Sequence, residues 1–299
     1  MLIKNFIKCS NIHLIIFVKI KTFYKLFYKH RFDKASVLRK IYLAFIFPLK
    51  YIYNYFYLEK KKNLDFIAIK DKSLFLKDLN FLFEYFNSDK GEYCYNQYSH
   101  PSKIDKKKLQ AHGYSKFYEK LFFKIKDEQI NILEIGSFYG NASAALFFYF
   151  KNATIFGADI NPDMFKYYSK RMINFYVDSS STESLKKDII DKKTQFKIII
   201  EDASHMLMDQ IISLFYLFPI LQSRGYFIIE ELDFPEKRED MRQNQEFPDL
   251  KSILKNVIKN QDFQSKYINE VQKKYFIENL DKIEIFKGNF NEIAIIKKK

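Results

Sequence analysis

Glycine, proline and cysteine are all scarce in this chain of 299 residues, which contains 7 Gly, 6 Pro and 2 Cys. So few chain-breaking residues exclude collagen, low-complexity linkers and disordered tails, because 47% of the residues are hydrophobic and can be buried. The two cysteines, Cys9 and Cys94, are too few for a disulfide-stapled secreted module. We therefore expect a folded, cytoplasmic protein with one large domain or two smaller ones.

Acidic residues are rare at the N-terminus, and the net charge of +14 is concentrated there. Residues 1–64 contain 14 Lys and Arg and only two acids, Asp33 and Glu59, so this segment carries +12 and the remainder of the chain +2. Since the body is nearly neutral, the basicity of the whole chain does not indicate a nucleic-acid-binding surface. We expect no nucleic-acid partner.

The basic segment 1–64 also carries large apolar side chains. A helical reading of its first part places an apolar stripe beside a basic one, formed by Ile16, Ile20, Phe23 and Phe27 and by Lys21, Lys25 and Lys29. Pro48 and Lys50 interrupt a second apolar run, 41–58, which is a poor membrane-spanning helix. The run Leu14–Val18 is too short for a signal peptide. Two interpretations stay open: peripheral contact with the anionic inner face of a membrane, or packing on the body or on a second subunit of a homo-oligomer.

Residues 129–299 alternate between short apolar runs and helical patterns. The runs predict five buried parallel strands: Asn131–Ile135, Thr154–Asp159, Ile173–Val177, Phe196–Glu201 and Gly225–Glu230. The segments between them predict helices: Asn141–Phe150, Asp163–Arg171, Thr182–Asp191 and Met208–Gln222. A polar, mostly helical insertion, 234–281, precedes a predicted antiparallel hairpin of Lys282–Phe286 and Asn291–Lys297.

This pattern predicts the α/β fold class, a Rossmann-like sheet of five parallel strands and a C-terminal antiparallel hairpin, with helices on both faces. Such a hairpin distinguishes a methyltransferase-like sheet from a plain dinucleotide-binding fold. We expect three parts: the basic amphipathic segment 1–64, a helical cap or lid region 65–128, and the sheet domain 129–299.

A glycine-containing turn follows the first predicted strand, with Glu134, Gly136 and Gly140 in an E-x-G-x-x-x-G pattern. Glycines at a strand-to-helix turn let the backbone approach a ligand and present helix N-terminal amides to it. Alone, the pattern also fits a tight turn without any ligand.

Polar residues also end the next two predicted strands. Asp159 ends the second strand, at the position that holds ribose hydroxyls in nucleotide-binding sheets. Asp178 and Ser179 follow the third strand, where they can reach an adenine edge or cap the next helix. Because the chain has no second G-x-G and no partner Arg, a nucleoside cofactor is favoured over a dinucleotide.

Acids and a histidine gather at the ends of the fourth and fifth predicted strands. Asp202 follows the fourth strand, and Glu230 and Glu231 end the fifth. Carboxylates this close repel one another unless a cation or shared proton intervenes, and a hard divalent ion such as Mg²⁺ relieves that repulsion best. His205, three residues after Asp202, can then act as the general base on a hydroxyl. Glu201 is expected to point to the other side of the sheet.

From residue 87 onward, the chain resembles class I S-adenosylmethionine-dependent methyltransferases, and more narrowly the metal-dependent sugar O-methyltransferases that tailor macrolides. The motifs that carry the resemblance are D-x-x-H at 202–205, the paired acids at 230–231, S-D-K-G at 88–91 and H-G-Y at 112–114. The resemblance implies S-adenosylmethionine and Mg²⁺ as cofactors. It also implies that Ser88 and Lys90 lie in a segment folded over cofactor and substrate.

The chain departs from that family at several positions. Glu231 stands where Asp is usual, Ala203 where Gly is usual, and Ser179 where Gln is common. Residues 1–64 have no recognisable counterpart in that family.

The expected activity is methylation of a hydroxyl on a sugar, in a glycoside, a polysaccharide or a lipid-linked glycan. In this scheme Asp202, Glu230 and Glu231 hold Mg²⁺ and His205 removes the proton. Three alternatives stay open: a non-catalytic nucleoside-binding module, a hydroxylase-like member of the superfamily, and an RNA-methylating member. The chain lacks an Asn/Asp-Pro-Pro-Tyr base-gripping motif, which ranks RNA methylation low.

Overall fold

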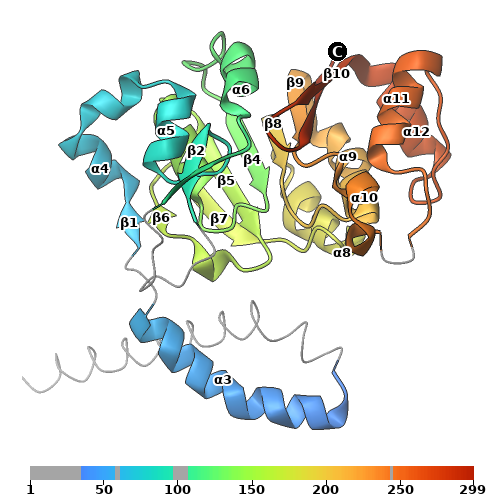
Figure 1. The fold of residues 1–299 in the computed structure, drawn as a ribbon. Helices are drawn as coiled ribbons and strands as arrows, with labels where there is room; N and C mark the ends of the chain where they lie inside the picture. The colour runs from blue at the N-terminus through green and yellow to red at the C-terminus, as the bar shows by residue number, and fades with distance from the viewer. Residues whose placement is uncertain (1–34, 58–60, 97–106, 243–244) are drawn as a thin grey trace, which may run out of the picture. The chain divides into compact units, whose positions relative to one another are not determined.

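The computed structural model describes residues 35–57, 61–96, 107–242 and 245–299 (Figure 1). The predicted apolar and basic stripes at 16–29 lie outside the described residues. The chain divides into two compact units, one formed by residues 1–60 with 161–164 and the other by residues 61–160 with 165–299.

The described part of the first unit is dominated by helix α3, Val37–Tyr57. Ser36 precedes the helix, and its hydroxyl accepts a hydrogen bond from the backbone N–H of Arg39 at 3.4 Å. Pro48 lies inside the helix, which continues past it to Tyr57. Within the described ranges, no helix has both the length and the apolar character needed to cross a bilayer.

The second unit contains a seven-stranded sheet in the order β10-β11-β9-β8-β4-β5-β7. Five neighbouring strands are parallel: β4 Asn131–Ile135, β5 Thr154–Asp159, β7 Met172–Tyr176, β8 Phe196–Glu201 and β9 Leu221–Ile229. The last two strands, β10 Leu280–Lys287 and β11 Glu292–Lys298, form an antiparallel hairpin whose β11 pairs with β9. The predicted fold class is confirmed.

Helices cover both faces of this sheet, because apolar side chains of each strand point alternately to either side. Ile132, Ile198 and Ile200 pack with α5 Leu79–Tyr85, α6 Ser115–Phe122 and α7 Asn141–Tyr149. Leu133 and Ile199 pack on the other face with α9 Leu207–Leu217, α11 Leu250–Asn260 and α12 Glu270–Asn279. Figure 1 shows these two helical layers on opposite sides of the strands.

The region before the sheet, 61–128, contains short helices and a small hairpin. Its elements are β1 Lys62–Asn63, α4 Leu64–Lys70, the 3₁₀ turn η1 Lys72–Leu76, α5, β2 Tyr93–Tyr95, β3 Lys108–Gln110 and α6. The side chains of Asn63, Asp71 and Asp78 accept backbone N–H groups at three of the helix starts. The carboxamide of Asn289, in the turn of the C-terminal hairpin, donates to the carbonyl of Ala111 at 2.8 Å and so ties this region to the sheet.

The predicted helix Asp163–Arg171 is wrong. The structure has a 3₁₀ turn, η3 Pro162–Met164, and a two-residue strand, β6 Tyr167–Tyr168, which pairs in parallel with β1. Phe165 and Tyr167 are both buried, a two-residue alternation typical of a strand and not of a helix.

For two other predicted helices, the structure differs from the prediction in where the helix ends or in how regular it is. The segment predicted as Met208–Gln222 is helical only to Leu217, followed by the 3₁₀ turn η6 Phe218–Ile220, and Leu221 already begins β9. Pro219 has no N–H to continue an α-helix. The segment Thr182–Asp191 is helical but irregular, with α8 Thr182–Ser184, the π-turn η4 Leu185–Ile189 and the 3₁₀ turn η5 Ile190–Lys192.

The insertion 234–281 is mostly helical, as predicted. It contains α10 Phe234–Lys237, the 3₁₀ turn η7 Glu239–Met241, and the two longer helices α11 and α12. Asp249 and Asn269 cap the starts of α11 and α12 through their side chains.

Candidate active site

A pocket of about 850 Å³ opens at the carboxyl ends of the parallel strands. Ligands bind at this edge in open α/β sheets, because the strand-to-helix loops leave a crevice there. Most of the residues predicted from the sequence line the pocket: Ser88, Lys90, Glu134, Gly136, Asp159, Asp178, Ser179, Asp202, His205 and Glu231. Gly140 and Glu230 are absent from its lining.

Glycine is required in the turn after β4 because two backbone segments approach each other closely there. Gly136 has a φ of +85°, and a Cβ built on it would lie 1.9 Å from the carbonyl oxygen of Asp202. Gly140 has a φ of +74° and immediately precedes α7. The turn thus brings the start of α7 beside the strand end that carries Asp202.

Asp159, at the end of β5, is anchored by the same turn. Its Oδ2 accepts the backbone N–H of Phe138 at 2.8 Å, and the side chain is only 9% exposed. The carboxylate therefore has a fixed position beside the pocket, as a residue that holds ribose hydroxyls requires.

Asp178 and Ser179 both line the pocket after β7. Asp178 Oδ1 accepts the backbone N–H and the hydroxyl of Ser180 at 3.1 and 2.6 Å. These residues do not cap the next helix, α8. Its cap is Ser181, whose hydroxyl accepts the N–H of Ser184.

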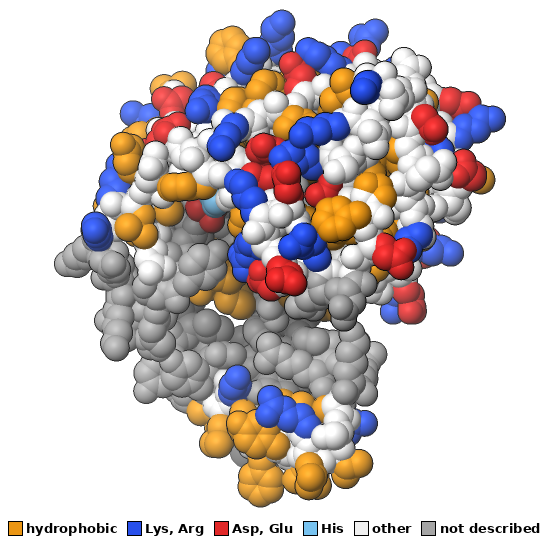
Figure 2. Space-filling model, turned by 45° about the vertical axis from the view of Figure 1, so that its right-hand side comes forward, with side chains coloured by type: hydrophobic (Ala, Val, Ile, Leu, Met, Phe, Trp, Pro, Cys, Tyr) orange, Lys and Arg blue, Asp and Glu red, His pale blue; other side chains and the backbone are white. Residues whose placement is uncertain are grey.

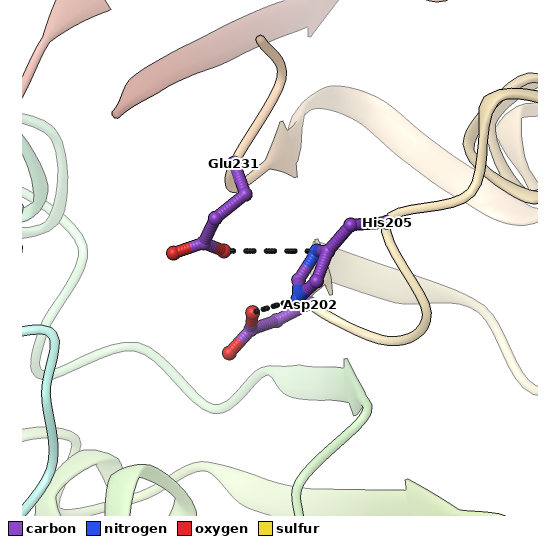
Figure 3. Close-up of side chains that lie close together, drawn as sticks. All are labelled: Asp202, His205 and Glu231. Atoms are coloured by element: carbon purple, nitrogen blue, oxygen red, sulfur yellow. Dashed lines mark ion pairs between the residues drawn. The ribbon is translucent and has the colours of Figure 1, made fainter. Parts of the chain in front are cut away.

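Three side chains converge at the ends of β8 and β9 (Figure 3). Asp202, His205 and Glu231 each offer a ligand atom, and these atoms lie within 4.8 Å of one another. His205 Nε2 lies 3.8 Å from Asp202 Oδ1, and His205 Nδ1 lies 3.7 Å from Glu231 Oε2. We call these three residues the outer group.

The outer group contains buried polar atoms without hydrogen-bond partners. His205 Nδ1 and Glu231 Oε2 are both of this kind. Both residues also have a positive φ, +56° and +46°, which costs conformational energy in residues other than glycine. The unpaired atoms of these two facing side chains are therefore available as ligand atoms on the pocket wall.

Protonation of the outer group follows from its burial. Burial lowers the pKa of His205, so its imidazole is neutral and able to accept a proton. Burial, followed by the neighbouring charges of Asp202 and Glu230, raises the pKa of Glu231 well above its ordinary value. A divalent cation would reverse that effect and satisfy the unpaired oxygen, so Asp202 and Glu231 fit a hard ion such as Mg²⁺.

A second set of side chains, the inner network, is centred on Lys90 and includes it. Its ammonium bonds Asp202 Oδ2, lies 2.9 Å from Glu230 Oε2 and lies 3.7 Å from Glu134 Oε1. The hydroxyl of Tyr118 donates to Glu230 Oε1, and that of Ser143 donates to Glu134 Oε2. We define the inner network as Lys90, Tyr118, Glu134, Ser143 and Glu230.

The inner network gives three predicted residues partners other than those expected from the sequence. Glu230, expected to bind the metal, has both oxygens engaged by Lys90 and Tyr118. Lys90 and Glu134, expected to bind the cofactor, interact with each other and with the acids at the strand ends. Burial alone would lower the pKa of Lys90, but the charges of Asp202, Glu230 and Glu134 raise it well above its ordinary value, so Lys90 is charged.

Sequence reasoning assigned no individual role to two residues that contact this site, His112 and Tyr118. His112 Nε2 lies 3.2 Å from Glu231 Oε1, and its ring stacks on Tyr114 with centroids 5.3 Å apart. Tyr118 lies one helical turn beyond Tyr114 and reaches Glu230. The H-G-Y motif already included His112, and the spacing of four residues between the two tyrosines could have indicated the second contact.

Glu201 occupies a different environment from its neighbour Asp202. It is fully buried and does not line the pocket. Its Oε1 accepts the N–H of Ala203 at 3.4 Å, whereas its Oε2 has no hydrogen-bond partner. Burial, followed by the charge of Asp202, raises the pKa of Glu201 to about 8.

The sheet order, the C-terminal hairpin and the glycine turn together define the fold of class I S-adenosylmethionine-dependent methyltransferases. No known protein-family model matches the chain. Among curated proteins, the chain is 28% identical over 132 residues to the 8-demethyl-8-α-L-rhamnosyl tetracenomycin-C 2′-O-methyltransferase of Streptomyces olivaceus. The match covers 42% of this chain and 34% of that protein.

Among solved structures, the chain is similar to the MycE methyltransferase from the mycinamycin biosynthetic pathway. The complex of MycE with Mg and SAH superposes with a TM-score of 0.54 at 20% identity, over 74% of this chain and 55% of MycE. The complex that also contains mycinamycin VI gives a TM-score of 0.55 at 19% identity, over 74% and 54%. The chain thus spans about a third of the curated relative and about half of MycE, and the similarity to MycE establishes the fold.

Proposed function

We propose that this protein is an S-adenosylmethionine-dependent, Mg²⁺-assisted O-methyltransferase that acts on a sugar hydroxyl, with His205 as the general base. The observation that carries the proposal is the outer group: two carboxylates and a neutral histidine with unpaired buried atoms, on the wall of a pocket that also contains the glycine turn and Asp159. The curated relative and MycE support it, because one is named as a sugar 2′-O-methyltransferase and the other was solved with Mg and SAH.

Different residues of the pocket bind the cofactor, hold the ion and remove the proton. The turn at Gly136 and Gly140 receives the amino-acid part of S-adenosylmethionine, Asp159 its ribose hydroxyls, and Asp178 and Ser179 its adenine. Asp202 and Glu231 hold the ion, with Glu230 behind them. Mg²⁺, when bound, supplies the positive charge that orients vicinal hydroxyls and lowers the pKa of one of them.

His205 then removes the proton from that hydroxyl. The oxygen attacks the methyl carbon in line with the carbon–sulfur bond, a C–O bond forms, and the electron pair of the broken bond remains on sulfur. The products are a methyl ether and S-adenosylhomocysteine, and the proton stays on His205 Nε2 or Nδ1 until solvent accepts it. The neutral state that burial gives to His205 suits this role.

The acceptor side of the pocket supports a sugar substrate. Phe234, Arg238 and Met241 line it, and the Phe234 ring meets the His205 ring edge-on with centroids 5.1 Å apart. An aromatic side chain beside the base can pack against the apolar face of a sugar ring while polar groups address its hydroxyls. We propose a glycoside, a polysaccharide or a lipid-linked glycan as the acceptor.

Thermal unfolding with added S-adenosylmethionine, with and without Mg²⁺, tests the cofactor pocket. Ligand at 100 times Kd should stabilise the protein by about 2.7 kcal/mol. The shift should disappear in Asp159→Ala and persist in Asp127→Ala, a matched control whose side chain is 65% exposed. No shift in the folded wild-type protein would refute the proposal.

The alternatives make different predictions in the same assay. A non-catalytic nucleoside-binding module would show the shift but would transfer no methyl group to any sugar acceptor. An RNA-methylating enzyme would retain RNA in a salt-dependent manner and methylate it. A hydroxylase-like member would convert its acceptor without consuming S-adenosylmethionine.

We further propose that helix α3 contacts the anionic inner face of a membrane, which would bring the enzyme to a lipid-linked or surface glycan. The helix contains Arg39, Lys40 and Lys50 and no acidic residue. Its described apolar side chains are largely exposed, namely Val37, Leu38, Ile41, Tyr42, Phe45, Leu49 and Ile52. In Figure 2, apolar (orange) and basic (blue) side chains of this helix lie side by side. Such a combination is typical of interfacial helices.

Sedimentation with lipid vesicles tests this contact. The full chain should sediment with vesicles containing anionic phospholipid and not with neutral ones. Phe45→Glu/Leu49→Glu should abolish sedimentation, whereas the matched pair Phe66→Glu/Ile69→Glu, exposed apolar residues of α4, should not. Equal binding by the two double variants would refute a role for α3.

A further inference from the structure

Lys90 is the buried cation of a site that is otherwise rich in acids. The residue is 1% exposed, and its ammonium lies among the carboxylates of Asp202, Glu230 and Glu134. With Glu231 there are four acids and one lysine in this part of the described structure. The ammonium pairs with Asp202, Glu230 and Glu134, whereas Glu231 Oε2 has no hydrogen-bond partner, so the site keeps a ligand atom for a second cation.

Asp202 is the residue that the two parts of the site share. Its Oδ2 bonds Lys90 in the inner network, while its Oδ1 faces His205 in the outer group. A cation held by Asp202 and Glu231 would therefore lie close to the ammonium of Lys90. Two positive charges a few ångströms apart repel more strongly in a partly buried site than in water, because the effective dielectric is lower there.

The main chain of Lys90 is fixed, so only its side chain can respond to that repulsion. Its carbonyl accepts the N–H groups of Tyr114 and Ser115 at 2.9 and 3.0 Å, and the neighbouring Gly91 carbonyl accepts that of Gly113 at 2.8 Å. These bonds hold the loop against the start of α6. Glu134 Oε1, at 3.7 Å from the ammonium, provides an acceptor toward which the side chain can move.

We propose that Lys90 is a tethered counter-ion that competes with the divalent cation for Asp202. The lysine stabilises the buried acids of the folded protein, and the arriving ion takes Asp202 from it while Lys90 shifts toward Glu230 and Glu134. Lys90 thereby sets how tightly the site holds its metal. This inference rests on the metal site of the proposed function.

Binding of Mn²⁺, followed by the electron paramagnetic resonance signal of the free ion, tests the competition without any measurement of activity. Lys90→Met keeps the length of the side chain and removes its charge. The variant should bind Mn²⁺ at least about tenfold more tightly than the wild type, because a repelling charge is lost. Lys108→Met is the matched control, since Lys108 is half-exposed and pairs with Glu84 outside the pocket; its affinity should equal that of the wild type.

Thermal unfolding provides the second readout. Without added Mn²⁺, Lys90→Met should unfold at a lower temperature than the wild type, because Asp202 and Glu230 lose their buried partner. Mn²⁺ should then stabilise the variant more than it stabilises the wild type. If Lys90→Met does not fold, Lys90→Met/Glu134→Gln, which removes one charge of each sign, replaces it in both measurements.

The outcomes separate this inference from the proposed function. Equal or weaker Mn²⁺ binding by the variant, with clear binding by the wild type, would overturn the competition and leave the metal site intact. Binding by neither protein would overturn both. Tighter binding by the variant supports the competition.

Discussion

The two sets of side chains at the sheet edge differ in how their polar atoms are satisfied. In the inner network, Lys90 and Tyr118 engage both oxygens of Glu230, and Ser143 donates to Glu134. In the outer group, buried atoms of His205 and Glu231 have no hydrogen-bond partner, although they lie only 3.7 Å apart. The same strand ends thus carry a satisfied network next to an unsatisfied one.

This difference indicates which residues hold the site together and which ones react. A buried acid with both oxygens bonded gains stability from its partners and has little capacity left for a ligand. A buried acid or imidazole with free atoms costs stability, and on the wall of a pocket those atoms are available to a ligand. Substitutions in the outer group should therefore change chemistry, whereas substitutions in the inner network should change stability.

His205→Ala should produce the largest effect. Loss of a general base typically lowers kcat by about 10²–10⁴-fold. Because the substitution leaves Asp159 and the glycine turn intact, the thermal shift produced by S-adenosylmethionine should stay the same. The measurement is the initial rate of S-adenosylhomocysteine formation with a sugar acceptor. An unchanged rate would remove His205 from the mechanism and would end the functional distinction between the two sets.

Glu201→Gln tests an acid that is unsatisfied but lies outside the pocket. Burial raises the pKa of Glu201 from its ordinary value of 4.5 to about 8, so the folded protein keeps this proton at pH values where the unfolded chain has lost it. The free energy of unfolding should therefore fall as the pH rises from 4.5 to about 8, by up to about 1.4 kcal/mol per pH unit. The glutamine cannot ionise, so the variant should lose this part of the pH dependence.

Urea denaturation between pH 5 and pH 8 provides the measurement. The control is Glu278→Gln on α12, whose side chain is 59% exposed and which should follow the wild-type profile. A wild-type slope in Glu201→Gln would show that Glu201 is already ionised in the folded protein. In that case an unpaired buried oxygen would not by itself indicate a destabilising residue. The inner network and the outer group could then not be distinguished by their unpaired atoms alone.

Much of the sheet and its edge could be predicted from the sequence, because the local pattern specifies them. The parallel strands are continuous apolar runs, and three of the five, β4, β5 and β8, have the predicted ends. The meeting of Asp202, His205 and Glu231 followed from a general property of parallel sheets, whose carboxyl ends share one edge. The helix predicted at 163–171 was wrong because the burial of this segment depends on its pairing with β1, which no local pattern reveals.

The partners of the acids could not be predicted in the same way. Lys90 lies 112 residues from Asp202 in sequence, and Tyr118 lies 112 residues from Glu230. A lysine in a polar loop normally extends into solvent, and the S-D-K-G motif indicated a segment over the pocket but not the buried ion pairs of Lys90. The sequence therefore located the acids correctly but could not assign Glu230 to the inner network.

Tyr118→Phe tests the inner network directly and should give the smallest of the three effects. The hydroxyl of Tyr118 donates to Glu230 Oε1, and both side chains are fully buried. Removal of the donor leaves that oxygen unpaired in the core, which typically costs about 1–3 kcal/mol. We expect a lower unfolding temperature with an unchanged thermal shift from S-adenosylmethionine.

Tyr149→Phe is the matched control for this variant. The hydroxyl of Tyr149 also donates to an acid, Glu119 Oε1 at 2.9 Å, but Glu119 is only partly buried and water can replace the lost donor. The control should therefore lose less stability than Tyr118→Phe. If Tyr118→Phe instead retains full stability and loses methyl transfer, then Glu230 belongs with the reacting residues, and the division between the inner network and the outer group must be redrawn to include it.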